Sequence, residues 1–569
     1  MTPVSFDGCL GWLHSGAISS DVAVLLCPPL GRDGLDSYHS FRVLADALAA
    51  TGTPALRFSY PGTMDSREVS PGADPWEEWL GAVRAGMDWL RGGTGATRIV
   101  LCGLRIGGTL AAVAAEGRDE VAGLILLAPV LRGRSYMRQI SIEMRMLTGK
   151  LDPAGGLDLG ELRLEADTVA RICAVDLRAS RLPGTCALAV FSQAGSPALD
   201  ECVAAWTADG HAVFTTGFAP LAPLLRRDLD ARGSEPAEFS DVLHWLRRVI
   251  VPVGSPARAI TPVSCVPHAD RREWPLRFGP DDTLFGVLCE PPGEATGRPL
   301  VIIGNAGRDP HYGIHRYGVQ LARDLAARGF ASLRIDFAGL GDSLSPPGTE
   351  SHVFETSRVN DFAAALDALQ RRGYARFAAH GVCAGAYHAL QIGLADRRIG
   401  ALLLVNLPFF EWEVGDTIES SARKTYSPRH YAMRLLRRDI WLRLLGNEID
   451  VRAIARAQLA RMRGRIAALA RRVARTSGLN SGGSFAHRSI DTLVRRGVRT
   501  LVLMAEADEG IDAIVKEFGP GGIGLNKFPD TRCVILPELD HTLSTRHMRQ
   551  WATYKMVAFL EGGAVVENG

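Results

Sequence analysis

The segment HGVCAGA, residues 380–386, lies between a predicted strand and a predicted helix and has the form Gly-x-Cys-x-Gly. Small residues on both sides of Cys383 suit a sharp strand-to-helix turn, where any bulk would collide with neighbouring elements. A thiolate at the N-terminus of the helix would also be stabilised by the helix dipole. The segment therefore predicts a nucleophile elbow with sulfur in place of oxygen. The alternative is a small buried cysteine that only packs, as most free cysteines do.

A cysteine nucleophile of this kind needs an acid and a histidine, each placed after a later strand. The segment TLVLMAEADEG, residues 500–510, predicts a strand that runs into an acidic turn, with Asp508 as the acid and Glu506 as its competitor. The segment CVILPELDHTLS, residues 533–544, predicts the next strand, which ends near His541. We predict that His541 accepts the thiol proton and that Asp508 orients the imidazole. A structural histidine on a loop tip is the alternative for His541.

Two backbone amides are expected to bind the oxyanion that forms during acyl transfer. One belongs to Ala384, directly after Cys383. The other belongs to the loop Gly304–Gly307, where Ala306 is the favoured donor and Asn305 the second choice.

The chain contains an internal duplication. The segment LRFSYPGTMDS, ending at Ser66, aligns with LRIDFAGLGDS, ending at Ser343. The segments RIVLCGLRIGGTLAA and RFAAHGVCAGAYHAL also align, so that Arg105 stands where the second copy has Cys383. In the first of these alignments Arg57 matches Arg334 and Asp65 matches Asp342 at one constant offset.

Each copy alternates strands with helices, which predicts a mostly parallel sheet flanked by helices. We therefore expect two tandem α/β domains. The first covers residues 1–250, and the second covers residues 263–569. A linker rich in Pro, Gly and Ser, residues 251–262, separates them.

The first copy lacks the residues that catalysis requires. An arginine cannot act as the nucleophile because its guanidinium stays protonated in proteins. The later strands of this copy offer no clear acid and no histidine at the matching positions. Arg105 predicts either an anion site for a carboxylate or phosphate, or a degenerate site with a purely structural role. We expect the first domain to be a pseudo-hydrolase that scaffolds or binds.

On these residues the chain resembles the α/β-hydrolase superfamily throughout. The two copies are similar to a pair of bacterial hydrolases associated with exosortase A and polysaccharide systems. The second copy carries the pattern of one member of this pair at Tyr312, His315, Arg316, Leu333 through Ser343, and Gly381 through Cys383. The first copy carries the pattern of the partner member in its GLR elbow and in Pro129 through Arg138. The resemblance implies acyl or ester chemistry without a metal or organic cofactor.

Each copy has an insertion after its last shared strand, at about residues 132–182 and 410–490, where hydrolases of this type commonly place a lid. Between Glu419 and Thr476 the second insertion holds fourteen Arg and one Lys against two Glu and two Asp. Its apolar residues recur at helical spacing, which predicts an amphipathic helix with a basic face. This face predicts an acidic partner, such as a carrier protein, coenzyme A or an anionic saccharide, or else it is only solvated. The candidate substrate or lid residues are His315, Arg316, Arg461 and Arg465.

Composition limits the other classes of function. The net charge is +2 and charged residues make up 22% of the chain, so a nucleic-acid partner is not expected. The ten cysteines show no CxxC pair and no zinc-binding spacing, which favours free thiols in a cytoplasmic location and predicts no metal site. The apolar runs are far shorter than the ~20 residues of a membrane span.

We therefore expect an enzyme that forms an acyl-thioester on Cys383 and passes the acyl group to water or another acceptor. It would be an ester or thioester hydrolase or an acyltransferase, and its acyl group could be bound to a carrier protein or to coenzyme A. The alternative is a catalytically dead binding or assembly protein of a biosynthetic or polysaccharide pathway.

Overall fold

The computed structural model describes the chain except for residues 149–154, 193–194, 220, 226–235, 257, 264, 269, 294–296, 345–352, 355–356, 413–483 and 564–569. Most of the second insertion, with Arg461 and Arg465, therefore lies outside the described residues.

Eight strands form the first sheet in the order β1-β2-β5-β4-β6-β7-β10-β11. The β1-β2-β5 part is antiparallel, and the strands from β5 to β11 run parallel to one another. These strands are β1 (Thr2–Phe6), β2 (Cys9–His14), β5 (Ala55–Phe58), β4 (Val22–Cys27), β6 (Arg98–Leu104), β7 (Val121–Leu127), β10 (Ala187–Phe191) and β11 (Val213–Thr216). Two small sheets pair β3 (Ile18–Ser20) with β12 (Gly254–Pro256) and β8 (Leu157–Asp158) with β9 (Arg163–Leu164).

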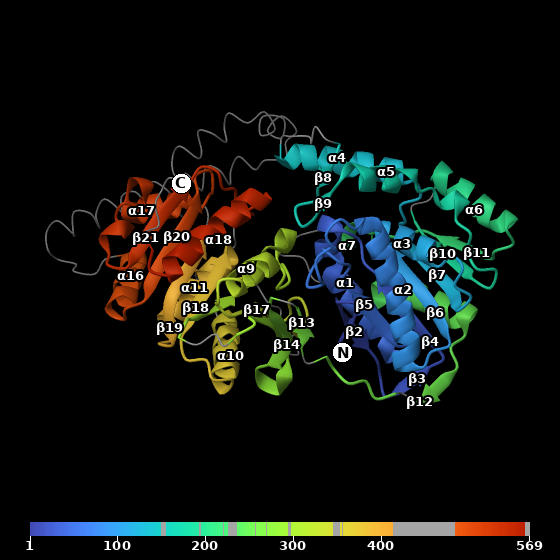
Figure 1. Ribbon diagram of the computed structural model, residues 1–569, viewed down its shortest axis with the longest axis horizontal. Helices are drawn as coiled ribbons and strands as arrows, with labels where there is room; N and C mark the ends of the chain where they lie inside the picture. The colour runs from blue at the N-terminus through green and yellow to red at the C-terminus, as the bar shows by residue number, and fades with distance from the viewer. Residues whose placement is uncertain are drawn as a thin grey trace, which may run out of the picture. The chain divides into compact units, whose positions relative to one another are not determined.

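Helices cover both faces of this sheet, and alternate residues of β4 show why. Ala23 and Leu25 pack in the core on one face, which includes Trp79 of α2. The helix α2 is drawn in front of this sheet in Figure 1. Val24 and Leu26 pack in the core on the other face, which is covered by α1. A strand buried on both faces is apolar at every position. The helices are α1 (Gly31–Ala50), α2 (Pro75–Thr94), α3 (Ile106–Ala114), α4 (Gly133–Thr148), α5 (Ala166–Ala174), α6 (Pro197–Ala208), α7 (Leu221–Leu224) and α8 (Ser240–Trp245).

Local sequence determines the ends of these helices, as α2 illustrates. The Asp74 side chain accepts a hydrogen bond from the Trp76 amide at 3.0 Å, and Pro75 occupies the first turn. An acidic N-cap followed by proline is the preferred start of a helix. Gly95 ends α2 in the left-handed conformation, φ 79°, which glycine adopts at little cost.

Nine strands form the second sheet in the order β13-β14-β15-β17-β16-β18-β19-β20-β21. Pairing is antiparallel from β13 to β17, and it is parallel for β17-β16 and for β19-β20-β21. The strands are β13 (Val266–Pro267), β14 (Arg272–Phe278), β15 (Leu284–Glu290), β17 (Ser332–Asp336), β16 (Leu300–Ile303), β18 (Phe377–Val382), β19 (Ile399–Val405), β20 (Arg499–Ala505) and β21 (Thr531–Leu536). The helices of this part are α9 (Tyr317–Ala326), α10 (Ser357–Arg371), α11 (Ala384–Ala395), α16 (Phe485–Arg495), α17 (Ile511–Phe518) and α18 (Arg546–Leu560).

The predicted fold class, two mostly parallel sheets flanked by helices, is thus confirmed. The duplication also extends to hydrogen bonds. The Ser66 hydroxyl accepts from the Leu10 amide at 2.9 Å and donates to the Ser59 carbonyl at 2.7 Å. The Ser343 hydroxyl accepts from the Phe285 amide at 2.8 Å and donates to the carbonyl of Asp336 at 2.6 Å.

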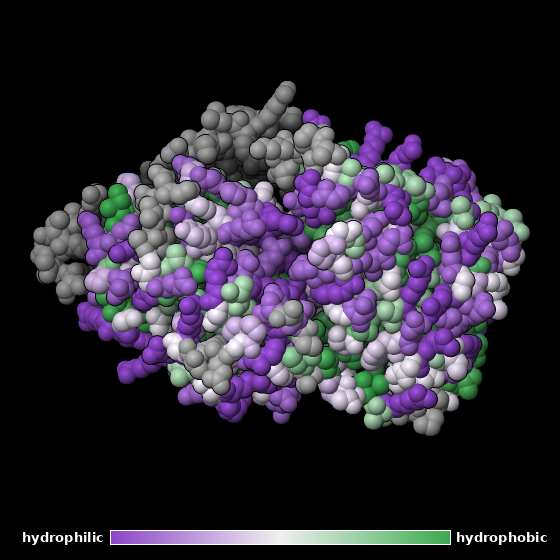
Figure 2. Space-filling model, viewed as in Figure 1, coloured by the Kyte–Doolittle hydropathy of each residue, from purple (hydrophilic) through white to green (hydrophobic). Residues whose placement is uncertain are grey.

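Packing divides the chain into two compact units. One comprises Met1–Ala378 with Thr542–Val557, and the other comprises Ala379–His541 with Ala558–Gly569. Hydrophilic residues cover much of the face drawn in Figure 2. Among the described residues, no helix combines the length and the apolar character that crossing a bilayer requires.

The elbow of the first repeat yields a test of the close backbone packing behind the fold. A Cβ on Gly103 would lie 2.5 Å from the carbonyl carbon of Gly107, whereas a Cβ on Gly92 in α2 would meet nothing within 4 Å. We expect Gly103→Ala to lower the free energy of unfolding by about 1–3 kcal/mol or more. The matched control Gly92→Ala should raise it by about 0.5–1 kcal/mol. Chemical denaturation measures both, and equal effects would contradict the packing described.

Candidate active site

Cys383 occupies the turn between β18 and α11. Its backbone has φ 54° and ψ −117°, a conformation that costs a non-glycine residue about 1–3 kcal/mol. The turn is closed by a hydrogen bond from the Ala386 amide to the Cys383 carbonyl at 3.0 Å. A Cβ on Gly381 would lie 2.1 Å from the carbonyl carbon of Gly385, so no side chain fits there. The strained turn presents a partly exposed thiol at the start of α11.

His541 and Asp508 lie at the ends of the neighbouring strands β21 and β20. The Nδ1 atom of His541 is 2.5 Å from Oδ2 of Asp508, and Oδ1 of Asp508 accepts from the Gly510 amide at 2.7 Å. The hydrogen bonds of His541 with Asp508 and with the Cys383 thiol raise its pKa to about 11, against a smaller lowering by burial. The structure thus brings Cys383, His541 and Asp508 together, while Glu506 is exposed.

Asn406, which the sequence analysis did not identify, holds the loop that carries His541. Its side-chain amide donates to the carbonyls of Asp540 and His541 at 3.0 Å each, and its Oδ1 accepts from the Ala505 amide at 2.8 Å. Asn406 is fully buried, directly after β19, with φ 50°. An Asn after an apolar strand tolerates this conformation better than most residues, which is the one signal that the sequence offered.

The predicted oxyanion donors fall in different parts of the chain. Ala384 is the first residue of α11 and belongs to the same compact unit as Cys383. Asn305 and Ala306 belong to the unit Met1–Ala378 with Thr542–Val557. The Asn305 side chain is occupied, because it donates to the Asp309 carbonyl at 2.7 Å and to Asp336 at 3.0 Å.

The two predicted substrate residues beside this loop have partners of their own. Arg316 is buried, and its guanidinium donates to both carboxylate oxygens of Glu68, at 2.9 and 2.7 Å, and to the Met64 carbonyl at 2.5 Å. His315 lies directly against Gly160, since a Cβ on that glycine would be 2.0 Å from the ring Nδ1 atom. Both contacts are made with residues of the first repeat.

The first repeat retains the strained turn without a nucleophile. Arg105 has φ 55° and ψ −124°, close to the values at Cys383. Its guanidinium lies 3.3 Å from Oδ2 of Asp33 and donates to Gln139 at 3.2 Å. The Gly31 amide, at the start of α1, donates to the Glu161 carboxylate at 2.9 Å. The cation and the amide are therefore already paired with carboxylates of the protein itself.

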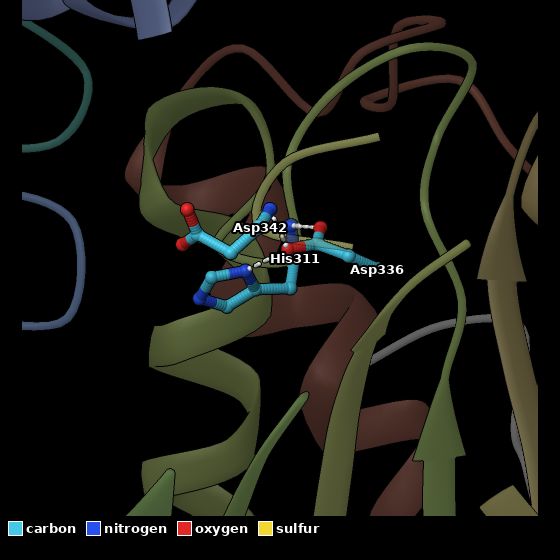
Figure 3. Close-up of side chains that lie close together, drawn as sticks. All are labelled: His311, Asp336 and Asp342. Atoms are coloured by element: carbon cyan, nitrogen blue, oxygen red, sulfur yellow. Dashed lines mark hydrogen bonds and ion pairs between the residues drawn. The ribbon is translucent and has the colours of Figure 1, made fainter. Parts of the chain in front are cut away.

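Three further side chains, His311, Asp336 and Asp342, form the one group among the described residues that has the spacing of a cation site (Figure 3). His311 bridges two carboxylates, with Nδ1 2.7 Å from Asp336 and Nε2 2.8 Å from Asp65. Burial would lower the pKa of His311, but Asp336 and Asp65 outweigh it and raise the pKa to about 10.

The remaining carboxylate of this group is also paired. Asp342 accepts from Arg57 at 2.7 Å and from the Tyr38 hydroxyl at 2.5 Å. A cation entering here would compete with a guanidinium and a protonated imidazole that already balance the carboxylates. The group is best described as a buried ion-pair network.

Comparison with known proteins found no matching family model and no matching curated protein. Several solved structures are similar to part of the chain. Est1E from Butyrivibrio proteoclasticus with ferulic acid bound is 17% identical, with a TM-score of 0.32, over 44% of this chain and 100% of that one. The α/β hydrolase GrgF from Penicillium sp. sh18 is 14% identical, with a TM-score of 0.31, over 42% of this chain and 94% of its own. VinJ is 20% identical, with a TM-score of 0.32, over 53% of this chain and 98% of its own. The fold is nevertheless established by the strand order itself.

The state of His311 can be tested by the pH dependence of stability. The folded pKa of His311, about 10, exceeds its ordinary value of 6.5. The stabilisation that the protonated imidazole adds to the folded state is therefore fully present below pH ~6.5 and is lost as the pH rises towards 10. Between pH 7 and 10, wild type should therefore lose unfolding free energy more steeply than His311→Gln, by up to about 1.4 kcal/mol per pH unit.

Urea denaturation at several pH values measures this difference. His211→Gln is the control, because the ring of His211 is buried against the carbonyl of Cys186, and it should keep the wild-type slope. Ring signals of His311 in NMR spectra provide a second measurement on the unaltered chain. A neutral imidazole at pH 8 would contradict the charged bridge.

Proposed function

We propose that this protein is an enzyme of the α/β-hydrolase type that transfers acyl groups through a thioester on Cys383. The observation that carries the proposal is the hydrogen-bonded series of Cys383, His541 and Asp508 on one compact unit. With Nδ1 of His541 engaged by Asp508, Nε2 is the ring nitrogen that faces the thiol. The raised pKa of His541 favours the state in which the imidazole carries the proton.

The reaction follows from this arrangement. The Cys383 sulfur attacks the carbonyl carbon of an ester or thioester, and the carbonyl oxygen becomes an oxyanion. The Ala384 amide at the start of α11 is one donor for it, and Ala306 is the second donor that we propose. His541 then gives its proton to the leaving alcohol or thiol, which departs as the acyl-thioester forms. Water or another nucleophile, deprotonated by His541, attacks the thioester and regenerates the thiol.

Several finer points belong to the same proposal. The first repeat, residues 1–250, acts as a non-catalytic scaffold joined by the linker 251–262. The basic segment 419–476 favours acyl groups bound to an acidic carrier protein or to coenzyme A. The ten free cysteines suit the reducing cytoplasm. The similarity to exosortase-associated hydrolases favours a polysaccharide or related biosynthetic pathway.

The decisive experiment is intact mass spectrometry after incubation with a panel of acyl thioesters and activated esters. We expect one acyl adduct, located on Cys383 and absent from Cys383→Ala. Asp508→Asn should slow acylation by roughly 100-fold or more, because the imidazole loses the group that orients it. Glu506→Gln, whose side chain is exposed, is the matched control and should stay within a few fold, as should Arg105→Ala.

Thiol labelling provides a second arm of this test. Burial raises the pKa of Cys9, Cys102, Cys186 and Cys289 to about 12, so these thiols should react slowly with iodoacetamide. We expect Cys383 to be labelled first, and His541→Ala to slow its labelling at neutral pH. If no adduct forms with any substrate and His541→Ala changes nothing, the protein is instead a binding or assembly protein.

A further inference from the structure

The motif that ends at Ser66 in the first repeat and at Ser343 in the second has no part in the proposed chemistry. Its residues nevertheless contact one another across the two repeats. Arg57 donates to Asp342 at 2.7 Å, and Arg334, its counterpart, donates to Asp65 at 2.9 Å. All four side chains are buried. Each copy of the motif thus supplies its arginine to the aspartate of the other copy.

The same exchange occurs between side chains and the backbone. Arg42 of the first repeat donates to the carbonyls of Gly341 and Ser343, both at 2.7 Å. Arg316 of the second repeat donates to the carbonyls at the matching positions, Met64 and Ser66. The two arginines do not stand at matching positions in the alignment. Each repeat therefore donates hydrogen bonds from an arginine to the backbone of the other repeat, although the two arginines are not equivalent in the alignment.

Reciprocal contacts of this kind define an isologous interface, in which residue i contacts residue j and j contacts i. Chance contact between two surfaces of one chain would pair unrelated segments. We propose that the two copies of the motif form an isologous interface, in which the first repeat is the partner surface on which the loop Asn305–Arg316 of the second repeat is built.

The loop depends on this interface through His311 and Asp336. The His311 amide donates to Oδ1 of Asp336 at 2.6 Å, and Asn305 donates to the same oxygen at 3.0 Å. The His311 ring is fixed between Asp336 and Asp65 of the first repeat. Arg316 closes the loop on the first repeat through Glu68, which also accepts from Arg323 at 2.5 Å. Without the first repeat, His311 would lose the buried carboxylate of Asp65, and Arg316 would lose Glu68 and the carbonyls of Met64 and Ser66.

The proposal goes beyond the catalytic one and is tested without any substrate. A specific protease site inserted after Thr261, in the exposed part of the linker, allows the folded full-length chain to be cut between the repeats. We expect the two cut pieces to remain one 1:1 complex at micromolar concentration, as measured by size-exclusion chromatography and native mass spectrometry. Separation of the wild-type pieces would overturn the proposal.

Variants of the cut protein test the reciprocal pairs. Asp65→Asn and Asp342→Asn, which remove one carboxylate each, should weaken association at least tenfold, because each removes the charge that a buried arginine of the other repeat pairs with. Asp21→Asn is the matched control, since Asp21 pairs with Arg98 at 2.8 Å within the first repeat, and it should leave association unchanged. Equal behaviour of the three variants would contradict an interface of this type.

The uncut chain provides a measurement for variants that associate too weakly to purify as pieces. In Asp65→Asn, amide hydrogen exchange in the peptide covering 304–316 should accelerate at least tenfold, whereas Asp21→Asn should leave it unchanged. Tyr38→Phe, which removes only the hydroxyl contact with Asp342, is the mildest variant and should retain the fold while weakening association a few fold. Unchanged exchange in Asp65→Asn would show that the loop does not depend on the first repeat.

Discussion

The architecture depends on one strained backbone conformation that occurs twice. At Cys383 and at Arg105 a non-glycine residue is held at φ near 55°, directly before a helix. The glycines around each turn permit the close backbone approach that this conformation requires. In the second repeat the strain exposes a thiol to His541, and in the first it only directs a guanidinium to Asp33. The turn is therefore present also in the repeat that has no thiol at this position, which indicates that it serves packing.

Asn406 and its counterpart Ala128 show the same separation of scaffold and chemistry. Each of the two residues directly follows a strand and has a positive φ. The backbone amide of each donates to the neighbouring strand, at 2.8 Å for Asn406 and 2.7 Å for Ala128. Only Asn406 has a side chain that donates to the loop carrying His541, at the carbonyls of Asp540 and His541. Where the histidine is absent, the amide that would position it is absent too. The first repeat therefore lacks the positioning amide and the histidine as well as the thiol.

Much of the fold was predictable because it follows from local pattern. Buried parallel strands are apolar at every position, so VAVLLC and TLVLMA were recognisable, and the glycine spacing around Cys383 identified the turn. Asp508 and Glu506 could not be separated in this way, since only the path of the chain after β20 decides which carboxylate meets His541. Alignment showed that Arg57 matches Arg334 and that Asp65 matches Asp342. It could not show that the arginines and aspartates pair across the repeats, because an alignment of equivalent positions carries no information about which residues are in contact.

The exchange of partners has a consequence for the order in which the chain is made. Domains generally fold as units during synthesis, beginning at the N-terminus. The first repeat is therefore complete while Arg334 and His311 are still to be translated. During that interval Asp65 lacks both of these partners, and Arg57 lacks Asp342. That surface also carries apolar side chains, since Trp12 packs against Phe285 and Met64 packs against Tyr312. Because the first repeat precedes the second in the chain, it can serve as a preformed surface for the loop that contains His311.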